Sequence, residues 1–515
     1  MDWVIRWSFP LRLLILITMM SAASATAVPP EGFVLTEIER PDGNPWNEAV
    51  GLTFDAQSRM FVWERGGRAW IVDEQAPVAT PLFDISEEVG AWDDHGMLGF
   101  ALDPDYAVNG YLYLFYIVDR HYWLHCTEPA DGGPSICDAD YDSEIDEYED
   151  ATFGRITRYT AILPPGASDY HDATEIDLAS RKVLLGETPS TGAPTTWTSH
   201  GVGTLVFAAD GTLLVSMGDG SRSCAGREAG CIPDIGADPF TYAAQALADG
   251  IITATEDVGA YRSQLINSHA GKILRLDPAT GDGVPSNPFF DASAPRAPRS
   301  RVWALGLRNP FRMALRPESG SSVAADGDPG VIYVGDVGWK RWEDLNVVTG
   351  PGQNFGWPVF EGMTLQETYS AEQVPNRDAP NPLFDPDGGC GQAFFFFTDL
   401  MQQDRRNPAS LLNPCDDASP VPPDIPTFVH RRPAGRRLEA QPDERPLVDV
   451  PWQCGRAPAN RRNEHRWHED RPGAAVHRPH LHRWRLVYGV SVSASIPKHL
   501  LSRGFSCRVA PQLCL

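Results

Sequence analysis

His200 is the single histidine of the segment 198–203 (TSHGVG), which directly precedes a strongly apolar run. Imidazole titrates near neutral pH, so a histidine here could take a proton from a substrate and release it later. Arg308 and Asn309 end another apolar run and are followed by Pro310. A guanidinium stabilises an oxyanion as it develops. The two segments indicate acid–base and oxyanion chemistry; the alternatives are a loop histidine that bonds a carbonyl and an arginine that caps a turn.

Strand pairs must position these residues. Four segments share one pattern: an alternating apolar strand, a turn with Asp or Pro and usually Gly, and a second strand rich in Tyr, Val, Leu and Phe. They are residues 50–63, 100–116, 205–218 and 313–336, with further strand-like pieces at 155–159 and 271–277. No long helical periodicity is evident. The pattern favours an all-β protein built from four-stranded blades around a channel, a β-propeller, and a β-sandwich is the alternative.

The order of these motifs, from about Pro45 to Gly362, resembles the soluble glucose/sorbosone dehydrogenase family. Members are six-bladed β-propellers that bind pyrroloquinoline quinone (PQQ) and Ca²⁺. The resemblance implies a propeller over residues 28–429. It also implies an oxidoreductase that passes hydride from a sugar or related alcohol to the quinone, with a histidine as base.

Residue roles follow from the same resemblance. His200 and Arg308 match the catalytic positions, and Asn309 and Asp94 join them as cofactor-binding residues. His95 competes with Asp94, and solvated loop charges are the alternative for both. The backbone carbonyls of Gly338 and Trp339 match a Ca²⁺ loop, and hard oxygen ligands suit that ion. Trp357, in the segment NFGWP, matches a family signature and is expected to be structural.

Two departures from the family pattern are visible. Val202 and Thr204 interrupt the family's His-x-Gly-Gly motif after His200. The family also binds the three carboxylates of the quinone with a lysine and arginines from its last blades, and no convincing equivalent follows Gly362; Lys498 lies in an anomalous tail. Two alternatives therefore stay open: a non-catalytic propeller that binds carbohydrate or protein, as in the hedgehog-interacting relatives of this fold, and a calcium-dependent propeller hydrolase.

Residues 1–27 have the layout of a signal peptide. Arg6 and Arg12 precede the apolar run 13–17, and small residues stand before Val28. The apolar core is shorter than the roughly 20 residues that span a bilayer. We expect a secreted or periplasmic protein with no membrane span in the mature chain. The sequence names neither the sugar nor the electron acceptor.

Six cysteines form locally spaced pairs in loop-like sequence: Cys126 with Cys137, Cys224 with Cys231, and Cys390 with Cys415. In an exported chain such pairs predict disulfides. Metal binding is the weaker alternative because no Cys-x-x-Cys spacing or histidine cluster accompanies them.

Charge is distributed unevenly along the chain. The net charge of −25 argues against nucleic acid as a partner, because nucleic acid selects basic surfaces. Residues 430–515 carry 16 Lys and Arg against 7 Asp and Glu, a net charge of +9, which leaves −34 on the preceding residues. One interpretation is a basic, Pro-rich disordered tail. Our preferred hypothesis is a tail translated out of frame from near Pro433, which would leave the last blade incomplete.

Overall fold

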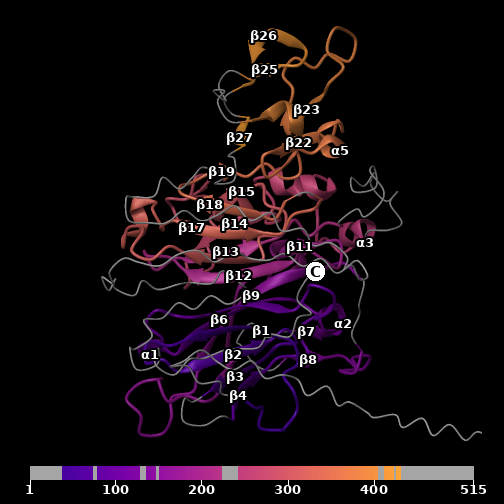
Figure 1. Ribbon diagram of the computed structural model, residues 1–515. Helices are drawn as coiled ribbons and strands as arrows, with labels where there is room; N and C mark the ends of the chain where they lie inside the picture. Colours follow the sequence, from indigo (N-terminus) through magenta and orange to yellow (C-terminus); the bar gives the residue numbers. More distant parts are fainter. Residues whose placement is uncertain are drawn as a thin grey trace, which may run out of the picture. The chain divides into compact units, whose positions relative to one another are not determined.

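The structure is a computed structural model, and it describes residues 38–72, 78–127, 135–145, 150–222, 242–340, 342–403, 411–422 and 425–430 (Figure 1). All of these residues belong to one of two compact units of the chain, the unit that includes Ile38–Ser495. Within these ranges no helix is long and apolar enough to cross a membrane. The predicted signal peptide, residues 431–515 of the tail and the pair Cys224–Cys231 lie outside them.

The first sheet is an antiparallel meander in chain order. Its strands are β1 (Ala49–Phe54), β2 (Met60–Glu64), β3 (Arg68–Val72) and β4 (Thr80–Asp84). Asp55 closes the turn between β1 and β2, because its Oδ1 accepts the backbone N–H of Gln57 at 3.0 Å and of Arg59 at 2.8 Å. Aspartate favours turns for this reason.

The second sheet contains the longest strands. Its order is β10-β9-β6-β5, and β11 pairs with β9. The strands are β5 (Met97–Leu102), β6 (Tyr111–Ile117), β9 (Thr152–Ala161), β10 (Ile176–Leu185) and β11 (Ala193–Thr195). Helix α1 (Tyr106–Asn109) joins β5 to β6, and α2 (Arg120–His125) leads into the hairpin β7 (Cys126–Thr127) and β8 (Ile136–Cys137). The predicted disulfide Cys126–Cys137 closes that hairpin.

The third sheet begins as a meander of β12 (Val202–Phe207), β13 (Leu213–Met217), β14 (Lys272–Leu276) and β15 (Val302–Leu305). Three short parallel strands extend it, in the order β19 (Gln353–Asn354), β27 (Phe428–His430) and β24 (Met401–Gln403). The fourth sheet is β16 (Arg312–Leu315), β17 (Ile332–Asp336) and β18 (Asp344–Val348).

The other elements are small. Three hairpins are β20 (Phe360–Glu361) with β21 (Thr364–Leu365), β22 (Pro375–Pro380) with β23 (Phe394–Phe396), and β25 (Leu412–Asn413) with β26 (Asp416–Pro420). The helices are α3 (Ala243–Ala248), α4 (Pro298–Arg301) and α5 (Glu367–Ser370), with 3₁₀ turns η1 (Pro189–Thr191), η2 (Gly259–Gln264), η3 (Ala324–Asp326) and η4 (Phe397–Leu400).

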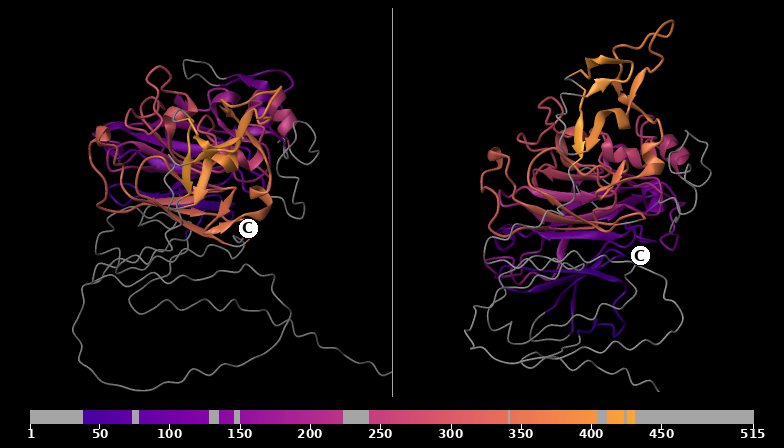
Figure 2. Two further views of the ribbon diagram at one scale, coloured as in Figure 1. Left: turned by 90° about the horizontal axis from the view of Figure 1, so that it is seen from above. Right: turned by 45° about the horizontal axis from the view of Figure 1, so that its top comes forward.

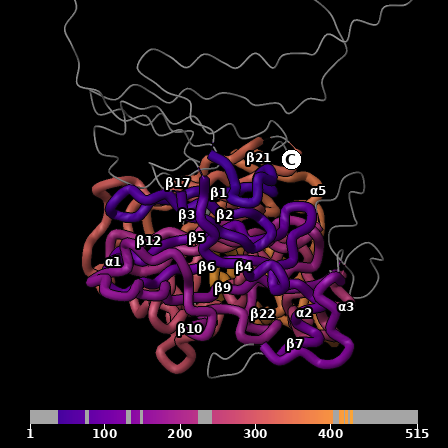
Figure 3. Tube along the Cα trace, turned by 90° about the horizontal axis from the view of Figure 1, so that it is seen from below, coloured from indigo at the N-terminus to yellow at the C-terminus, as the bar shows by residue number. Residues whose placement is uncertain are grey.

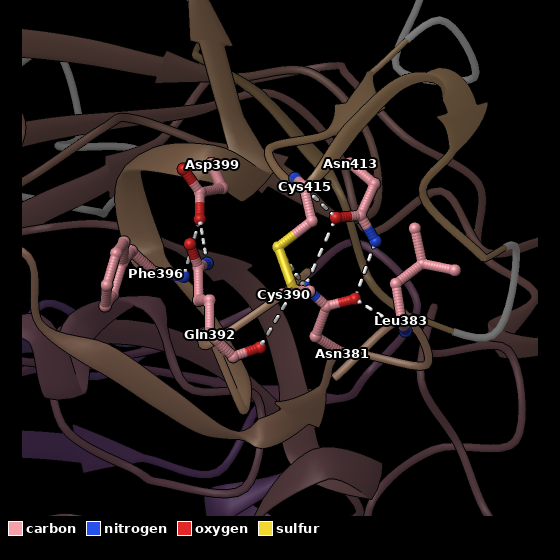
Figure 4. The surroundings of a disulfide bond; sticks show 8 residues. All are labelled: Asn381, Leu383, Cys390, Gln392, Phe396, Asp399, Asn413 and Cys415. Carbon is pink, nitrogen blue, oxygen red and sulfur yellow. Dashed lines mark hydrogen bonds between the residues drawn. A yellow bond between two sulfur atoms is a disulfide. The ribbon is translucent and has the colours of Figure 1, made fainter. Parts of the chain in front are cut away.

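A second predicted disulfide, Cys390–Cys415, ties the β22–β23 hairpin region to β25 and β26 (Figure 4). Beside it the side-chain amides of Asn381 and Asn413 pair reciprocally, with N···O distances of 3.2 and 2.6 Å. Each amide oxygen also accepts a nearby backbone N–H, so the polar groups around this buried disulfide are satisfied.

The sheets pack face to face in chain order. Strand β5 contacts β1 and β2 of the first sheet, and β12 contacts β5, β6 and β16. The stacked sheets are visible in Figure 2, and Figure 3 labels β1, β2, β5, β6 and β12. Separate apolar cores fill the successive interfaces, with Phe61 and Phe100 in one, Phe115 and Leu205 in the next, and Trp303 in a third. The arrangement is all-β and propeller-like, as the sequence indicated.

Each predicted strand pair is confirmed: 50–63 is β1–β2, 100–116 is β5–β6, 205–218 is β12–β13 and 313–336 is β16–β17. The described part of the chain holds four sheets of the blade type. After β18 the chain returns to the third sheet as β19, which pairs with β15. The last described strand, β27, pairs with β19 and β24.

Candidate functional site

His200 stands two residues before the start of β12, and its backbone has a left-handed φ of +57°. Such a conformation is uncommon for a residue with a side chain and persists only where its surroundings hold it. Here the Gly220 N–H donates to the His200 carbonyl at 2.9 Å. A Cβ on Gly218 would lie 2.2 Å from the same oxygen, so only glycine fits there. The end of β13 therefore fixes where the imidazole points.

Asp219 is the partner of that imidazole. Nδ1 of His200 lies 2.8 Å from Oδ1 of Asp219, and both residues are buried, with 4% and 1% of their surface exposed. Burial opposes ionisation of Asp219, but the nearby charges of His200 and Arg308 outweigh it and lower the pKa of the carboxyl below its ordinary value. An ionised Asp219 keeps the proton of a neutral His200 on Nδ1 and leaves Nε2 as the accepting atom.

Trp357 holds the other oxygen of Asp219. Its indole Nε1–H donates to Oδ2 at 2.6 Å, and its ring lies 5.5 Å from the guanidinium carbon of Arg308. We expected Trp357 to be structural, and it is buried, but it also contacts two polar groups of the site. Sequence reasoning assigned no role to Asp219. Its only local signal is the Gly-Asp-Gly turn that directly follows an apolar strand.

Of the two competing neighbours, Asp94 is the one that meets His200. Its Oδ2 accepts the His200 backbone N–H at 3.1 Å, and no described residue contacts its buried Oδ1 by a hydrogen bond. Burial raises the pKa of Asp94, although His200 and Arg308 oppose the shift. The His95 ring packs edge-on to Trp92 instead, and burial lowers its pKa to about 3, so it stays neutral in the core.

Arg308 and Asn309 are held through their backbone. The carboxylate of Asp336, the last residue of β17, accepts both N–H groups, at 3.2 Å from Arg308 and 2.7 Å from Asn309. Burial and the charge of Asp344 raise the pKa of Asp336 to about 8, although these two N–H groups oppose the shift. The Arg308 side chain donates from Nη1 to the Val337 carbonyl at 3.0 Å, and no described residue accepts from its buried Nε.

Gly338 and Trp339 follow directly after that carbonyl. The Trp339 ring lies 6.1 Å from the Trp357 ring, so the loop lies beside the group formed by His200, Asp219 and Arg308. In the described ranges, no three His, Cys, Asp or Glu side chains come together in a way that could hold a metal ion. A calcium site at this loop therefore depends on backbone oxygens, and it stays a prediction.

The sequence model of one family, described as Glucose / Sorbosone dehydrogenase, matches residues 44–230 and 248–403. The chain belongs to this family. The match spans every predicted site residue, Asp94, His200, Arg308, Asn309, Gly338 and Trp339.

Relatives within and near the family are distant in sequence. The chain is 26% identical to the HIPL1 protein of Arabidopsis thaliana, over 59% of this chain and 39% of that one. It is 21% identical to the aldose sugar dehydrogenase YliI of Escherichia coli (strain K12), over 70% of each. The chain thus spans about two-fifths of the length of its HIPL relative. The solved PQQ-bound aldose sugar dehydrogenase of Streptomyces coelicolor is 19% identical over 68% of each chain, with a TM-score of 0.39.

Two buried cations support the site of this glucose/sorbosone dehydrogenase family protein, and sequence reasoning missed both. Arg262 donates to Thr196 Oγ1 at 2.7 Å and to the Gly220 carbonyl at 3.2 Å. Lys272 donates to three backbone carbonyls at 2.6–3.1 Å. Burial lowers the pKa of each, and the bond from Arg262 to the Gly220 carbonyl holds the residue next to Asp219. These contacts form between residues far apart in sequence, so no local motif indicates them.

Proposed function

We propose that the protein is an exported oxidoreductase that oxidises sugars or related alcohols with PQQ as the hydride acceptor. The observation that carries the proposal is the buried contact between His200 and Asp219 at 2.8 Å, next to Arg308. Membership of the Glucose / Sorbosone dehydrogenase family supports the class of reaction. A relative named as an aldose sugar dehydrogenase supports an aldose as the substrate.

The polar groups around His200 suit a quinone. Arg308 Nε is a buried donor and Asp94 Oδ1 a buried polar atom, and neither has a hydrogen-bond partner among the described residues. Buried polar groups ordinarily have partners, so these two atoms are suited to a ligand. Burial raises the pKa of Asp94, which stands where relatives carry glutamine or glutamate beside the cofactor. Arg308 and Asn309 would hold the cofactor's other oxygens.

Residues of the chain would carry out the proton transfer and stabilise the charges of the reaction. When bound, PQQ supplies a two-electron acceptor for the hydride that leaves the substrate carbon. His200 accepts the hydroxyl proton on Nε2 as the carbonyl product forms, and the Asp219 carboxylate stabilises the imidazolium. Arg308 stabilises negative charge that develops on the acceptor. The proton leaves His200 to solvent after the product departs.

Two finer features belong to the same proposal. The carbonyl oxygens of Gly338 and Trp339 would hold Ca²⁺, which polarises the quinone. The fold would be a six-bladed propeller whose last blade is left incomplete by a tail translated out of frame. A secreted or periplasmic location follows from the signal-peptide layout of residues 1–27.

A second candidate is a propeller that binds carbohydrate or protein without catalysis. One observation favours it: the printed sequence has no convincing equivalent after Gly362 of the lysine and arginines that bind the quinone carboxylates in the family. Each missing charge-assisted contact would weaken binding by about 1.5–3 kcal/mol.

Titration with PQQ and Ca²⁺ distinguishes the oxidoreductase from the non-catalytic binding propeller. We would follow quinone binding by absorbance and then dye reduction with a panel of aldoses. The oxidoreductase proposal expects saturable binding and aldose-dependent dye reduction that is lost in His200→Ala with binding retained. Saturable carbohydrate binding with no quinone binding would establish the second candidate instead.

A further inference from the structure

Glu361, at the end of β20, accepts hydrogen bonds from backbone N–H groups of the proposed calcium loop. Its Oε1 accepts the Trp339 N–H at 2.6 Å and the Lys340 N–H at 2.7 Å. Its Oε2 contacts the side-chain amide of Gln366. Successive N–H groups that converge on one anion form a nest, and bonds to a carboxylate are stronger than neutral ones. With 2% of its surface exposed, Glu361 is a buried partner of the loop backbone.

These bonds determine where the loop carbonyls point. In a trans peptide the C=O and the N–H point in opposite directions. The Trp339 N–H is directed at Glu361, so the Gly338 carbonyl is directed away from it. The Lys340 N–H is directed at the same oxygen, so the Trp339 carbonyl is directed away as well.

The peptide that joins Val337 to Gly338 follows the same rule. The Gly338 N–H donates to Glu343 Oε2 at 3.1 Å, and the opposite end of this peptide, the Val337 carbonyl, accepts from Arg308. The Val337 carbonyl therefore faces Arg308, on the opposite side of its peptide from Glu343. No described residue donates a hydrogen bond to the Gly338 or Trp339 carbonyl.

The loop has no space for a side chain at Gly338. A Cβ there would lie 1.4 Å from the Trp342 carbonyl oxygen, so only glycine permits this path of the backbone. Among the described residues, the acidic side chains of Asp336 and Asp344 near the loop are buried, and burial raises their pKa values to about 8 and about 7.

We propose that Glu361 is a positioning residue for a divalent cation: it binds the loop N–H groups and thereby directs the carbonyl oxygens of Gly338 and Trp339 at the ion. The inference rests on the calcium site of the proposed function and adds the residue that orients it. Glu361 does not ligate the ion, because its own oxygens are bonded on the opposite side of the loop.

The test uses the full-length protein without quinone. Ca²⁺ affinity is measured by calorimetry, and Tb³⁺ serves as a luminescent stand-in that the neighbouring indole of Trp339 sensitises. Glu361→Gln keeps an oxygen that can accept the two N–H groups but removes the charge, and Glu361→Ala removes both. Glu367→Gln is the matched control, because Glu367 is an exposed carboxylate six residues further along the chain.

Partners that orient metal ligands typically change affinity by about 10- to 100-fold. We expect Ca²⁺ affinity to fall about tenfold in Glu361→Gln and about 100-fold in Glu361→Ala, with Glu367→Gln unchanged. Thermal denaturation without Ca²⁺ gives the purely structural effect. If Glu361→Ala does not fold, the Ca²⁺ affinity of Glu361→Gln still tests the proposal.

Wild-type Ca²⁺ affinity in a folded Glu361→Gln variant overturns the proposal, and so does a wild-type protein that binds neither Ca²⁺ nor Tb³⁺. Failure of the proposed function is distinct, because it is scored by PQQ absorbance and dye reduction. A protein that binds Ca²⁺ through Glu361 but never binds quinone would keep this inference and lose the oxidoreductase.

Discussion

Replacing Asp219 with asparagine isolates the carboxylate that holds His200. Oδ1 of Asp219 lies 2.8 Å from His200 Nδ1 and also accepts the Ser221 N–H at 3.0 Å, while Oδ2 accepts the Trp357 indole N–H at 2.6 Å. An asparagine amide has one accepting oxygen, so its NH₂ group must face one of these donors. If it faces His200, the imidazole changes tautomer and Nε2 can no longer accept a proton.

The expected fall in the turnover number follows from the loss of the Asp219 charge. A hydrogen bond to an ionised group contributes about 1.5–3 kcal/mol, and about 1.4 kcal/mol corresponds to a tenfold change in rate. The turnover number of Asp219→Asn should therefore fall about 10- to 150-fold, and further if the tautomer changes. Quinone affinity should change much less, because Asp219 faces the imidazole and the indole rather than the proposed cofactor.

The assay is steady-state dye reduction with an aldose, together with a quinone titration of the same preparations. Asp105→Asn is a matched control, since Asp105 is exposed and its side chain makes no capping bond at the start of α1. Turnover of Asp219→Asn within twofold of the wild type would refute the role given to this carboxylate.

Three further predictions concern stability and the gene. His269 is buried, and burial lowers its pKa to about 3 from about 6.5 in an unfolded chain, so the unfolded state binds the proton first. The contribution of His269 to the free energy of unfolding should therefore fall by up to about 1.4 kcal/mol for each pH unit below about 6.5. Urea titrations at about pH 7 and about pH 5 measure this, and a His269→Gln variant with the wild-type pH dependence contradicts it. Replacing Cys390 and Cys415 together by serine opens a disulfide with a sequence separation of 25 residues and should lower stability by about 3–4 kcal/mol in thermal melts; equal melting temperatures argue against any stabilising role. Resequencing the gene across the codons for residues 432–445 should reveal one inserted or missing base, and an intact frame in independent clones rejects the frame hypothesis.

Most strands could be predicted because their signal is local. Alternating apolar residues with Asp, Pro or Gly turns indicated β1–β2, β5–β6, β12–β13 and β16–β17. The parallel additions β19, β24 and β27 could not be predicted. They are two or three residues long, and they pair with strands distant in the sequence, which leaves no periodic pattern to detect.

The site divides in the same way. The family resemblance pointed to His200, Arg308, Asn309 and Asp94, and the structure brings these residues together. The role of Asp219 and its contact with Trp357 could not be predicted, because that contact joins residues 138 positions apart. Glu361 escaped notice for another reason: it acts on backbone N–H groups, and the sequence does not show where a backbone group points.

The central claim is that His200 takes a proton while the bound quinone takes hydride from the same alcohol. The most direct measurement is anaerobic mixing of the protein, loaded with PQQ and Ca²⁺, with an aldose, while the quinone absorbance is followed in wild type and His200→Ala. The account predicts rapid quinone reduction in the wild type and none, or a rate at least about 100-fold slower, in the variant. Equal reduction rates in the two proteins, or a wild type that never binds the quinone, would contradict it.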